Sequence, residues 1–255
     1  MERQYIEDLV SVIMPTYNAS RYVGQALESV FAQTYHKLEI VIVDDHSSDN
    51  LVEIIEKCKK EHPEICFFPL EKNMGAGYAR NKALELANGQ YVAFLDCDDE
   101  WMPDKLKRQV ECIKEKGTSF CYAAIEMMDE EGKTIKKKRN IRETCDYKYL
   151  LHNTIIATSS VIVDRSVVGD FRMHLRRGGQ DYATWLNLLR DGTVAYGINE
   201  VLVRYRVTSN SLSSNKLDSI RQVWEVQTQD EKINKIAALF HVCCFILNAL
   251  KKYLI

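Results

Sequence analysis

Short, continuously apolar runs alternate with amphipathic stretches through the first part of the chain. The apolar runs predict buried strands at Leu9–Met14, Leu38–Val43, Ile65–Leu70 and Tyr91–Leu95. Between them, helical spacing of apolar residues predicts helices at Ser20–Gln33, Asn50–Lys60 and Gly75–Asn88. Strands without polar alternation suit a parallel sheet that is covered by helices on both faces. The pattern therefore predicts an α/β fold with a mostly parallel central sheet.

The remainder of the chain mixes strands and helices less regularly. We expect a helix at Pro103–Lys116, strands at Ser119–Met128, Thr154–Val163 and Glu200–Val207, and a helix that begins just after Gly179. A basic arm, Lys133–Arg139, follows a turn in the sequence. This arm predicts either a solvated hairpin or a contact with a membrane or an anionic acceptor.

Polar residues whose side chains could bind a ligand or take part in a reaction follow the predicted strands at their carboxyl ends. Ligands of parallel α/β sheets bind outside these ends, so we expect the residues to converge on one edge. They are Pro15, Thr16, Tyr17 and Asn18 after the first strand, Asp44 and Asp45 after the second, Arg80 beyond the third, and Asp96, Cys97 and Asp98 after the fourth.

Three acids lie within four positions at Asp96, Asp98 and Asp99. Carboxylates this close repel one another unless a positive group lies between them. A divalent cation such as Mg²⁺ or Mn²⁺ that carries a substrate's phosphates accounts for the pattern. The alternative is a solvated acidic turn that caps the helix near Pro103.

A nucleoside diphosphate suits the same edge chemically. Tyr17 can stack on a base, Asp45 can accept the imide N–H of uracil, and Arg80 can pair with a diphosphate oxygen. The alternative for Arg80 is a surface residue that pairs with Glu85 or another acid. The glycine pair at the start of the third helix lacks the third glycine of a dinucleotide fingerprint, which disfavours NAD.

Composition limits which partners the protein is expected to bind and in which cellular compartment it is expected to work. The 255-residue chain has a formal net charge of −2, so no general affinity for nucleic acid is expected. None of its 8 cysteines forms a C-x-x-C pair, which favours a reducing cytoplasm over a disulfide framework. The polar N-terminus through Asp8 predicts no secretory signal.

Four segments together resemble the family 2 glycosyltransferases, the inverting enzymes of GT-A fold: VSVIMPTYNASRYVGQALESVFAQTY, EIVIVDDHSSD, NMGAGYARNKAL and YVAFLDCDDEWMPDKL. The resemblance runs from about Val10 to Asn210 and is most marked to enzymes of bacterial teichuronic acid, capsule and O-antigen assembly. It implies a GT-A domain at 1–210, with a Rossmann-like nucleotide-sugar half at about 1–100 and an acceptor half at about 101–210. Residues 211–255 would form a helical extension.

The resemblance further implies a UDP-sugar donor and metal-assisted transfer to an acceptor hydroxyl. It matches Asp45 to a uracil contact, Asp96 to a contact with the nucleotide sugar, and Asp98 to the ligand of Mn²⁺ or Mg²⁺. The other implied donor-binding residues are Pro15, Thr16, Tyr17, Asn18 and Arg80. The Ser-rich stretch at 208–215 resembles a loop that closes over the donor.

Asp181 follows two glycines that lead into a predicted helix. A carboxylate at a helix start is stabilised by the helix dipole, so the spacing alone favours a capping role. The resemblance instead implies that Asp181 is the general base, which accepts the proton of the acceptor hydroxyl in a single displacement. Gln180 replaces the acid that the family usually carries at the preceding position.

The C-terminal run Ile236–Leu250 is apolar except for His241 and Asn248, which form a polar stripe with Asn234 and Lys252. The run is shorter than the roughly 20 residues that a membrane span needs. We expect either an in-plane membrane helix, or a helix packed on its own domain or on a second subunit. A peripheral location on the inner face of the cell membrane would suit a polyprenyl-diphosphate-linked saccharide acceptor.

Two other functions fit parts of the sequence. A nucleotidyltransferase that makes sugar nucleotides would carry a glycine-rich, basic loop after the first strand, and PTYNAS has neither feature. A catalytically silent sugar-nucleotide-binding or scaffold protein at the membrane would not need Asp181 together with the donor-site acids. The sequence therefore favours an inverting, metal-dependent glycosyltransferase that builds a lipid-linked or cell-surface polysaccharide.

Overall fold

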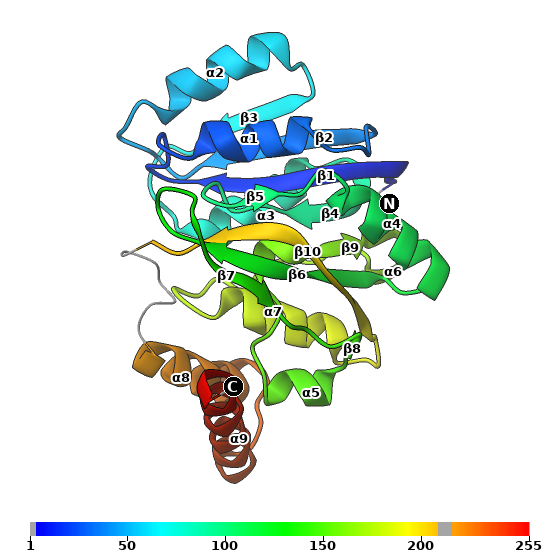
Figure 1. Ribbon diagram of the computed structural model, residues 1–255, viewed down its shortest axis with the longest axis vertical. Coiled ribbons are helices and arrows are strands. Elements are labelled where there is room, and N and C mark those ends of the chain that lie inside the picture. Colours follow the sequence, from blue (N-terminus) through cyan, green and yellow to red (C-terminus); the bar gives the residue numbers. More distant parts are fainter. Residues whose placement is uncertain (1–3, 209–215, 255) are drawn as a thin grey trace.

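The computed structural model describes residues 4–208 and 216–254. The described strands form one mixed sheet (Figure 1). In chain order they are β1 (Ile6–Thr16), β2 (Leu38–Asp44), β3 (Ile65–Pro69), β4 (Gly89–Phe94), β5 (Glu100–Trp101), β6 (Phe120–Met128), β7 (Thr134–Arg139), β8 (Thr144–Cys145), β9 (Ile162–Asp164) and β10 (Ala195–Arg206). The helices are α1 (Val23–Phe31), α2 (Leu51–Glu61), α3 (Ala76–Leu86), α4 (Lys105–Lys116), α5 (Tyr147–Leu151), α6 (Arg165–Val168), α7 (Gln180–Leu189), α8 (Lys216–Glu225) and α9 (Lys235–Leu254), with a 3₁₀ turn η1 (Thr158–Ser160) and a π-helical turn η2 (Val226–Asp230).

The first half of the sheet is parallel, as the unbroken apolar runs predict. The strand order is β3-β2-β1-β4-β9-β6-β10-β5, with β7 paired to β6 and β8 paired to β10. β1 pairs in parallel with both β2 and β4, and Thr16 lies opposite Asp44 in the register. The carboxyl ends of β1 and β2 therefore lie side by side. The short β9 runs antiparallel to β4 and β6 and joins the two halves of the sheet.

Residues of β1 are buried on both faces of the sheet because helices cover both. Val12 and Met14 belong to a core cluster with residues of α1, α2 and α4, whereas Ile13 belongs to a second cluster with residues of α3 and α7. Each such side chain stabilises the fold by about 1.5–3 kcal/mol through burial. This explains why the polar residues are confined to the strand ends, where the candidate site lies.

The strand expected at Thr154–Val163 is wrong over most of its length. The segment instead contains η1 and only the short β9. The hydroxyl of Ser160 donates to the carbonyl of Ala157 at 2.7 Å, and Ser159 uses its hydroxyl to bind the acidic loop after β4. Such side-chain hydrogen bonds compete with a strand ladder. The basic arm is confirmed as a hairpin strand, because β7 pairs antiparallel with β6.

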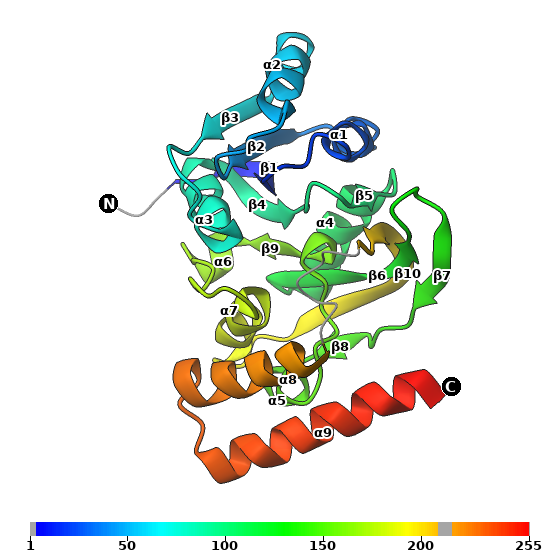
Figure 2. The same ribbon diagram turned by 90° about the vertical axis from the view of Figure 1, so that its left-hand side faces the viewer.

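The C-terminal helices pack on the second half of the molecule. Val223 of α8, Val226 of η2 and Val242 of α9 belong to the same core cluster as residues of α5 and α7. Figure 2 shows α9 along the base of the molecule, beneath α5 and α8. Among residues 4–208 and 216–254, no helix combines the length and apolar character that crossing a membrane requires. Residues 209–215, most of the expected closing loop, lie outside the described part of the chain.

Candidate active site

The loops after β1 and β2 are tied together by short hydrogen bonds. The buried carboxylate of Asp44 accepts from the hydroxyl of Thr16 at 3.3 Å and from the backbone N–H of Ser47 at 3.0 Å. Asn18, whose φ is +48°, accepts from the backbone N–H of Ser48 at 2.8 Å through its side-chain oxygen. The ring of Tyr17 remains 52% exposed beside these loops. It is therefore accessible for stacking, whereas Pro15 is buried within β1.

Asp45 fixes the turn that begins α3. Its carboxylate is buried and accepts from the backbone N–H of Met74 at 2.6 Å and of Gly75 at 2.8 Å, one on each oxygen. A carboxylate has about four acceptor positions, so the two bonds leave capacity for a further N–H donor. Asp45 thus couples the end of β2 to the helix that carries Arg80.

Arg80 and Asp96 form a direct ion pair at the carboxyl end of β4, with 2.5 Å between Nη2 and Oδ1. Burial alone would lower the pKa of Arg80, but the charge of Asp96 and, after it, that of Asp181 raise it. Arg80 therefore stays charged. The alternative of a surface arginine paired with Glu85 is wrong, because Arg80 is buried and Lys82 pairs with Glu85 instead. The Nε of Arg80 has no hydrogen-bond partner among the described residues.

The acids of the loop after β4 have different surroundings. Asp99 is fully buried and accepts from the hydroxyl of Ser159 at 2.5 Å and from the backbone N–H of Arg206 at 2.8 Å. Asp98 is half-buried, and burial, followed by the negative charge of Asp96, raises its pKa to about 6. Burial, followed by the negative charge of Asp98, raises the pKa of Asp99 well above its ordinary value as well, so the acids of this loop disfavour one another's charge.

A divalent cation suits Asp98 on the chemistry of its surroundings. Among the described residues, no group of three or more His, Cys, Asp or Glu side chains is arranged to hold a metal ion. Mg²⁺ is typically held by one or two carboxylates together with substrate phosphates. Asp96 is already paired with Arg80, and Asp99 is bound by Ser159 and Arg206. Asp98 is therefore the residue that fits a metal shared with a diphosphate.

Asp181 reaches the same region from the second half of the chain. It lies in the first turn of α7, and its Oδ2 accepts from the hydroxyl of Thr158 at 3.4 Å. The N-cap residue of the helix is Gly179, so Asp181 does not occupy the capping position. Its charge acts on Arg80, which links it to the Arg80–Asp96 pair. Thr158 is followed in η1 by Ser159, which binds Asp96 and Asp99, so Asp181 lies near the acidic loop.

Two further contacts beside the candidate site involve Gln180 and Arg206, and the sequence pattern does not predict them. The buried side-chain oxygen of Gln180 has no hydrogen-bond partner among the described residues and lies against Gly77, where an added Cβ would come within 2.4 Å of it. Arg206 is buried and donates from Nε to the backbone carbonyl of Asp98 at 2.8 Å. The available signal for Arg206 was its place as the second arginine, after Arg204, in the predicted strand Glu200–Val207.

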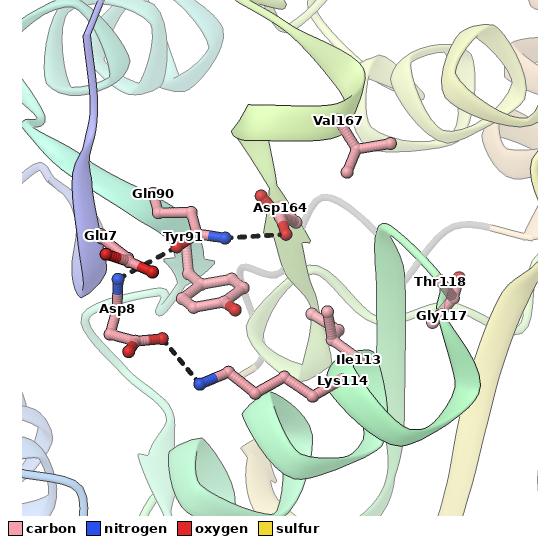
Figure 3. A pocket seen from close by; sticks show the side chains of 10 residues that line it. All are labelled: Glu7, Asp8, Gln90, Tyr91, Ile113, Lys114, Gly117, Thr118, Asp164 and Val167. Carbon is pink, nitrogen blue, oxygen red and sulfur yellow. Dashed lines mark hydrogen bonds and ion pairs between the residues drawn. The ribbon is translucent and has the colours of Figure 1, made fainter.

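A cavity of about 380 Å³ lies elsewhere (Figure 3). Gln90 and Tyr91, at the beginning of β4, line it, so it is at the opposite edge of the sheet from the acidic loop. Among its charged groups, Asp8 and Lys114 form an ion pair of 2.7 Å, and Asp164 accepts from the side-chain amide of Gln90 at 3.0 Å. The cavity therefore does not belong to the candidate active site.

Comparison with known proteins assigns the chain to a family. The model of glycosyl transferase family 2 matches residues 11–177. The chain belongs to glycosyltransferase family 2. A Bacillus subtilis protein named as a teichuronic acid biosynthesis glycosyltransferase, TuaG, is 41% identical over 96% of this chain and 98% of its own length. The Escherichia coli β-1,3-glucosyltransferase WfgD is 32% identical over 96% of this chain and 95% of its own length.

Solved structures of glycosyltransferases have the same fold. TarS of S. aureus, in complex with UDP-GlcNAc, aligns with a TM-score of 0.71 at 20% identity, over 93% of this chain and 71% of its own. The mannosyltransferase PcManGT of Pyrobaculum calidifontis, in complex with GDP-Man and Mn²⁺, aligns with a TM-score of 0.71 at 18% identity, over 94% and 73% of the two chains. The predicted GT-A fold is thereby confirmed, and this family 2 member is a glycosyltransferase rather than a nucleotidyltransferase.

Proposed function

We propose that this family 2 glycosyltransferase transfers a sugar, with inversion, from a UDP-sugar to a hydroxyl of a lipid-linked or growing cell-surface saccharide. The observation that carries the proposal is the proximity of the Arg80–Asp96 ion pair, Asp98 and Asp181 at the carboxyl edge of the sheet. These groups supply a cation, a metal ligand and a base at one place. A single displacement of the diphosphate by the acceptor hydroxyl, assisted by one base, inverts the configuration of the anomeric carbon.

The named relatives support the substrate classes. The name of WfgD gives UDP-Glc as its donor and a GlcNAc-diphosphoundecaprenol as its acceptor. TuaG is named for teichuronic acid, and TarS was solved with UDP-GlcNAc. We infer a UDP-sugar donor and a saccharide acceptor linked to a polyprenyl diphosphate, in keeping with the identity to WfgD along nearly the whole chain.

On the donor side, Tyr17 stacks on the uracil, and Asp45 accepts its imide N–H through the acceptor capacity that the turn leaves. Arg80 neutralises negative charge on the diphosphate, and its buried charge is held in place by Asp96. Thr16 and Asn18 shape the loops around the nucleotide.

On the acceptor side, Asp181 accepts the proton of the attacking hydroxyl. Thr158 donates a hydrogen bond to one of its oxygens and so orients the carboxylate. Asp98 would hold Mn²⁺ or Mg²⁺ against the diphosphate, and the bound ion would neutralise charge that develops on the leaving group.

The free thiols support a reducing compartment. All 8 cysteines are unpaired, including the exposed Cys66 and Cys243. We propose a cytoplasmic enzyme that works at the inner face of the cell membrane, where a polyprenyl-linked acceptor would be presented.

The test is nucleotide release from a panel of UDP-sugars by the purified full chain, with and without Mn²⁺, with GDP-mannose as a matched control donor. We expect cation-dependent UDP release from one donor, stimulation by a lipid extract that contains acceptors, and loss of the release in Asp98→Asn. Binding of UDP without turnover of any donor would support a silent binding protein and contradict the proposal.

A further inference from the structure

Helix α9 exposes an apolar stripe to solvent. Ile236, Leu239, Phe240 and Leu247 are 84%, 57%, 62% and 58% exposed, and Cys243 between them is exposed as well. Their positions follow the spacing i, i+3, i+4, i+7 and i+11, which places all five on one side of the helix. At 1.5 Å per residue the stripe is roughly 17 Å long.

The polar residues of α9 point toward the protein instead. Nδ1 of His241 lies 3.1 Å from the side-chain oxygen of Gln227, and the side-chain amide of Asn248 donates to the backbone carbonyl of His152 at 3.3 Å. Ala238 on the same side is fully buried. The inner side of the helix thus has intramolecular partners, whereas the apolar residues of the outer side are exposed. Figure 2 shows α9 at the base of the molecule.

The charges within the segment from Lys232 to the end of α9 have one sign. The sequence has no Asp or Glu from Lys232 to the end of the helix, and lysines occur at both ends: Lys232 and Lys235 at the start, Lys251 and Lys252 near the finish. Lys232 and Lys235 are exposed. The two acids just before this stretch are already paired, Asp230 with Arg176 and Glu231 with Arg190, each at 2.8 Å.

We propose that the outer side of α9 lies in the surface of a membrane that contains anionic lipids. Apolar side chains would enter the boundary of the acyl chains while the flanking lysines contact the headgroups. A second copy of the chain fits less well. Two such helices packed face to face would bring lysines against lysines in either relative direction. The inference deepens the proposed function, on which it rests for its purpose, because a lipid-linked acceptor is presented at such a surface.

Co-sedimentation of the purified full chain with lipid vesicles tests this proposal without donor, acceptor or turnover. Failure of the proposed transferase activity would therefore be seen separately. We expect binding to vesicles of phosphatidylcholine with phosphatidylglycerol, and weaker binding to phosphatidylcholine alone. Leu239→Gln combined with Phe240→Gln should weaken binding roughly tenfold or more, since both apolar side chains are lost from the boundary.

The control removes two exposed apolar side chains elsewhere. Ile6 and Val167 are 52% and 70% exposed and lie away from α9, so Ile6→Gln with Val167→Gln should bind vesicles like the unchanged chain. Each of Lys232→Gln and Lys235→Gln should weaken binding to the anionic vesicles by roughly fivefold. Unchanged UDP binding and circular dichroism verify that the variants are folded.

Three results would overturn the proposal. The first is that the unchanged chain does not bind anionic vesicles. The second is that binding survives the paired α9 substitution, which would place the contact elsewhere, with the basic arm as the first candidate. The third is that sedimentation shows a dimer that the α9 substitutions dissociate, while vesicle binding is absent. The last result would assign the stripe to a second copy of the chain.

Discussion

Two buried arginines, Arg80 and Arg206, lie in the candidate active site, and their charges are compensated by different kinds of contact. Arg80 is paired with one carboxylate and keeps an unpartnered Nε among the described residues. Arg206 is surrounded: it donates to the side chains of Gln25 and Glu100 and to three backbone carbonyls, one of them that of Asp98. Arg80 is thus the arginine with hydrogen-bonding capacity left for a ligand, and Arg206 is the one that holds the acidic loop.

Replacing Arg206 tests that structural role. We expect Arg206→Met to lower the free energy of unfolding by about 3–5 kcal/mol, because the carbonyls of Asp98, Asp129 and Glu130 lose this donor and Glu100 keeps only its pair with Arg204. Chemical denaturation measures the loss. Arg206→Lys should rescue little of it, since an ammonium cannot reproduce the planar fork of donors. The exposed Arg221 provides the control, and Arg221→Met should change the value by less than about 1 kcal/mol. A small effect at Arg206 would contradict its assignment.

At this scale the sequence predicts residues whose chemistry is local. The acids after β4 and the residues after β1 could be found because a strand end precedes them directly. The partners of Asp99 could not, because Ser159 lies 60 positions along the chain and Arg206 lies 107 positions away. Pairing over such distances depends on the strand order, which the sequence pattern does not contain.

The junctions between elements depend on close backbone approach. At Gly89, where α3 gives way to β4, an added Cβ would come 2.4 Å from the backbone carbonyl oxygen of Leu9. β1 has a register shift between Ile6 and Val10 at this point, and Asp8 has a φ of +56°. The irregular strand therefore passes directly over Gly89.

We expect Gly89→Ala to destabilise the protein by about 1–3 kcal/mol, because a backbone carbonyl cannot move aside as a side chain can. In Gly24→Ala, the matched control in α1, the new Cβ meets nothing within 4 Å. That substitution should leave stability unchanged or raise it by about 0.4–1 kcal/mol. Equal midpoints of thermal unfolding for the two variants would show that the close approach is absent.

Helix α4 begins with a buried lysine whose charge is disfavoured. Burial lowers the pKa of Lys105 to about 7 from 10.5, while its Nζ donates to the side chain of Gln109 at 2.7 Å. Between these two values the unfolded chain binds more protons than the folded one, so stability rises with pH. Relative to Lys105→Met, the wild type should gain up to about 1.4 kcal/mol per pH unit across this window. If the unfolding free energies of the wild type and Lys105→Met change in parallel with pH, this result would contradict the lowered pKa of Lys105.

The elements were predictable where burial is regular and not where hydroxyl side chains intervene. The helix and strand positions of the first half follow from unbroken apolar runs and helical spacing. The segment from Thr154 to Val163 is equally apolar at its start, yet the hydroxyls of Ser159 and Ser160 bind the acidic loop and nearby backbone instead of extending a strand. Apolar content alone does not reveal that competition.

The whole molecule brings two halves of the chain to one edge of one sheet. The first half supplies the loops proposed to face the nucleotide, and the second supplies Asp181 on α7, whose charge acts on Arg80. The C-terminal helices pack beside α7: Gln222 of α8 and Val226 of η2 lie against Gly179, two residues before Asp181, the proposed base. The α/β character was predictable from periodicity. The inward orientation of His241 and Asn248 on α9 was not, because a stripe in a sequence does not say which side of a helix meets the protein.

The central claim is that Asp181 serves transfer and not donor binding. The most direct measurement compares the wild type with Asp181→Asn, using UDP release from the preferred UDP-sugar in the presence of Mn²⁺ and acceptor, with UDP affinity measured calorimetrically on the same samples. We predict that UDP affinity stays within about twofold while acceptor-dependent release falls by roughly 10²–10⁴-fold, the usual contribution of a general base. Full activity of Asp181→Asn, or loss of UDP binding in step with activity, would contradict the account.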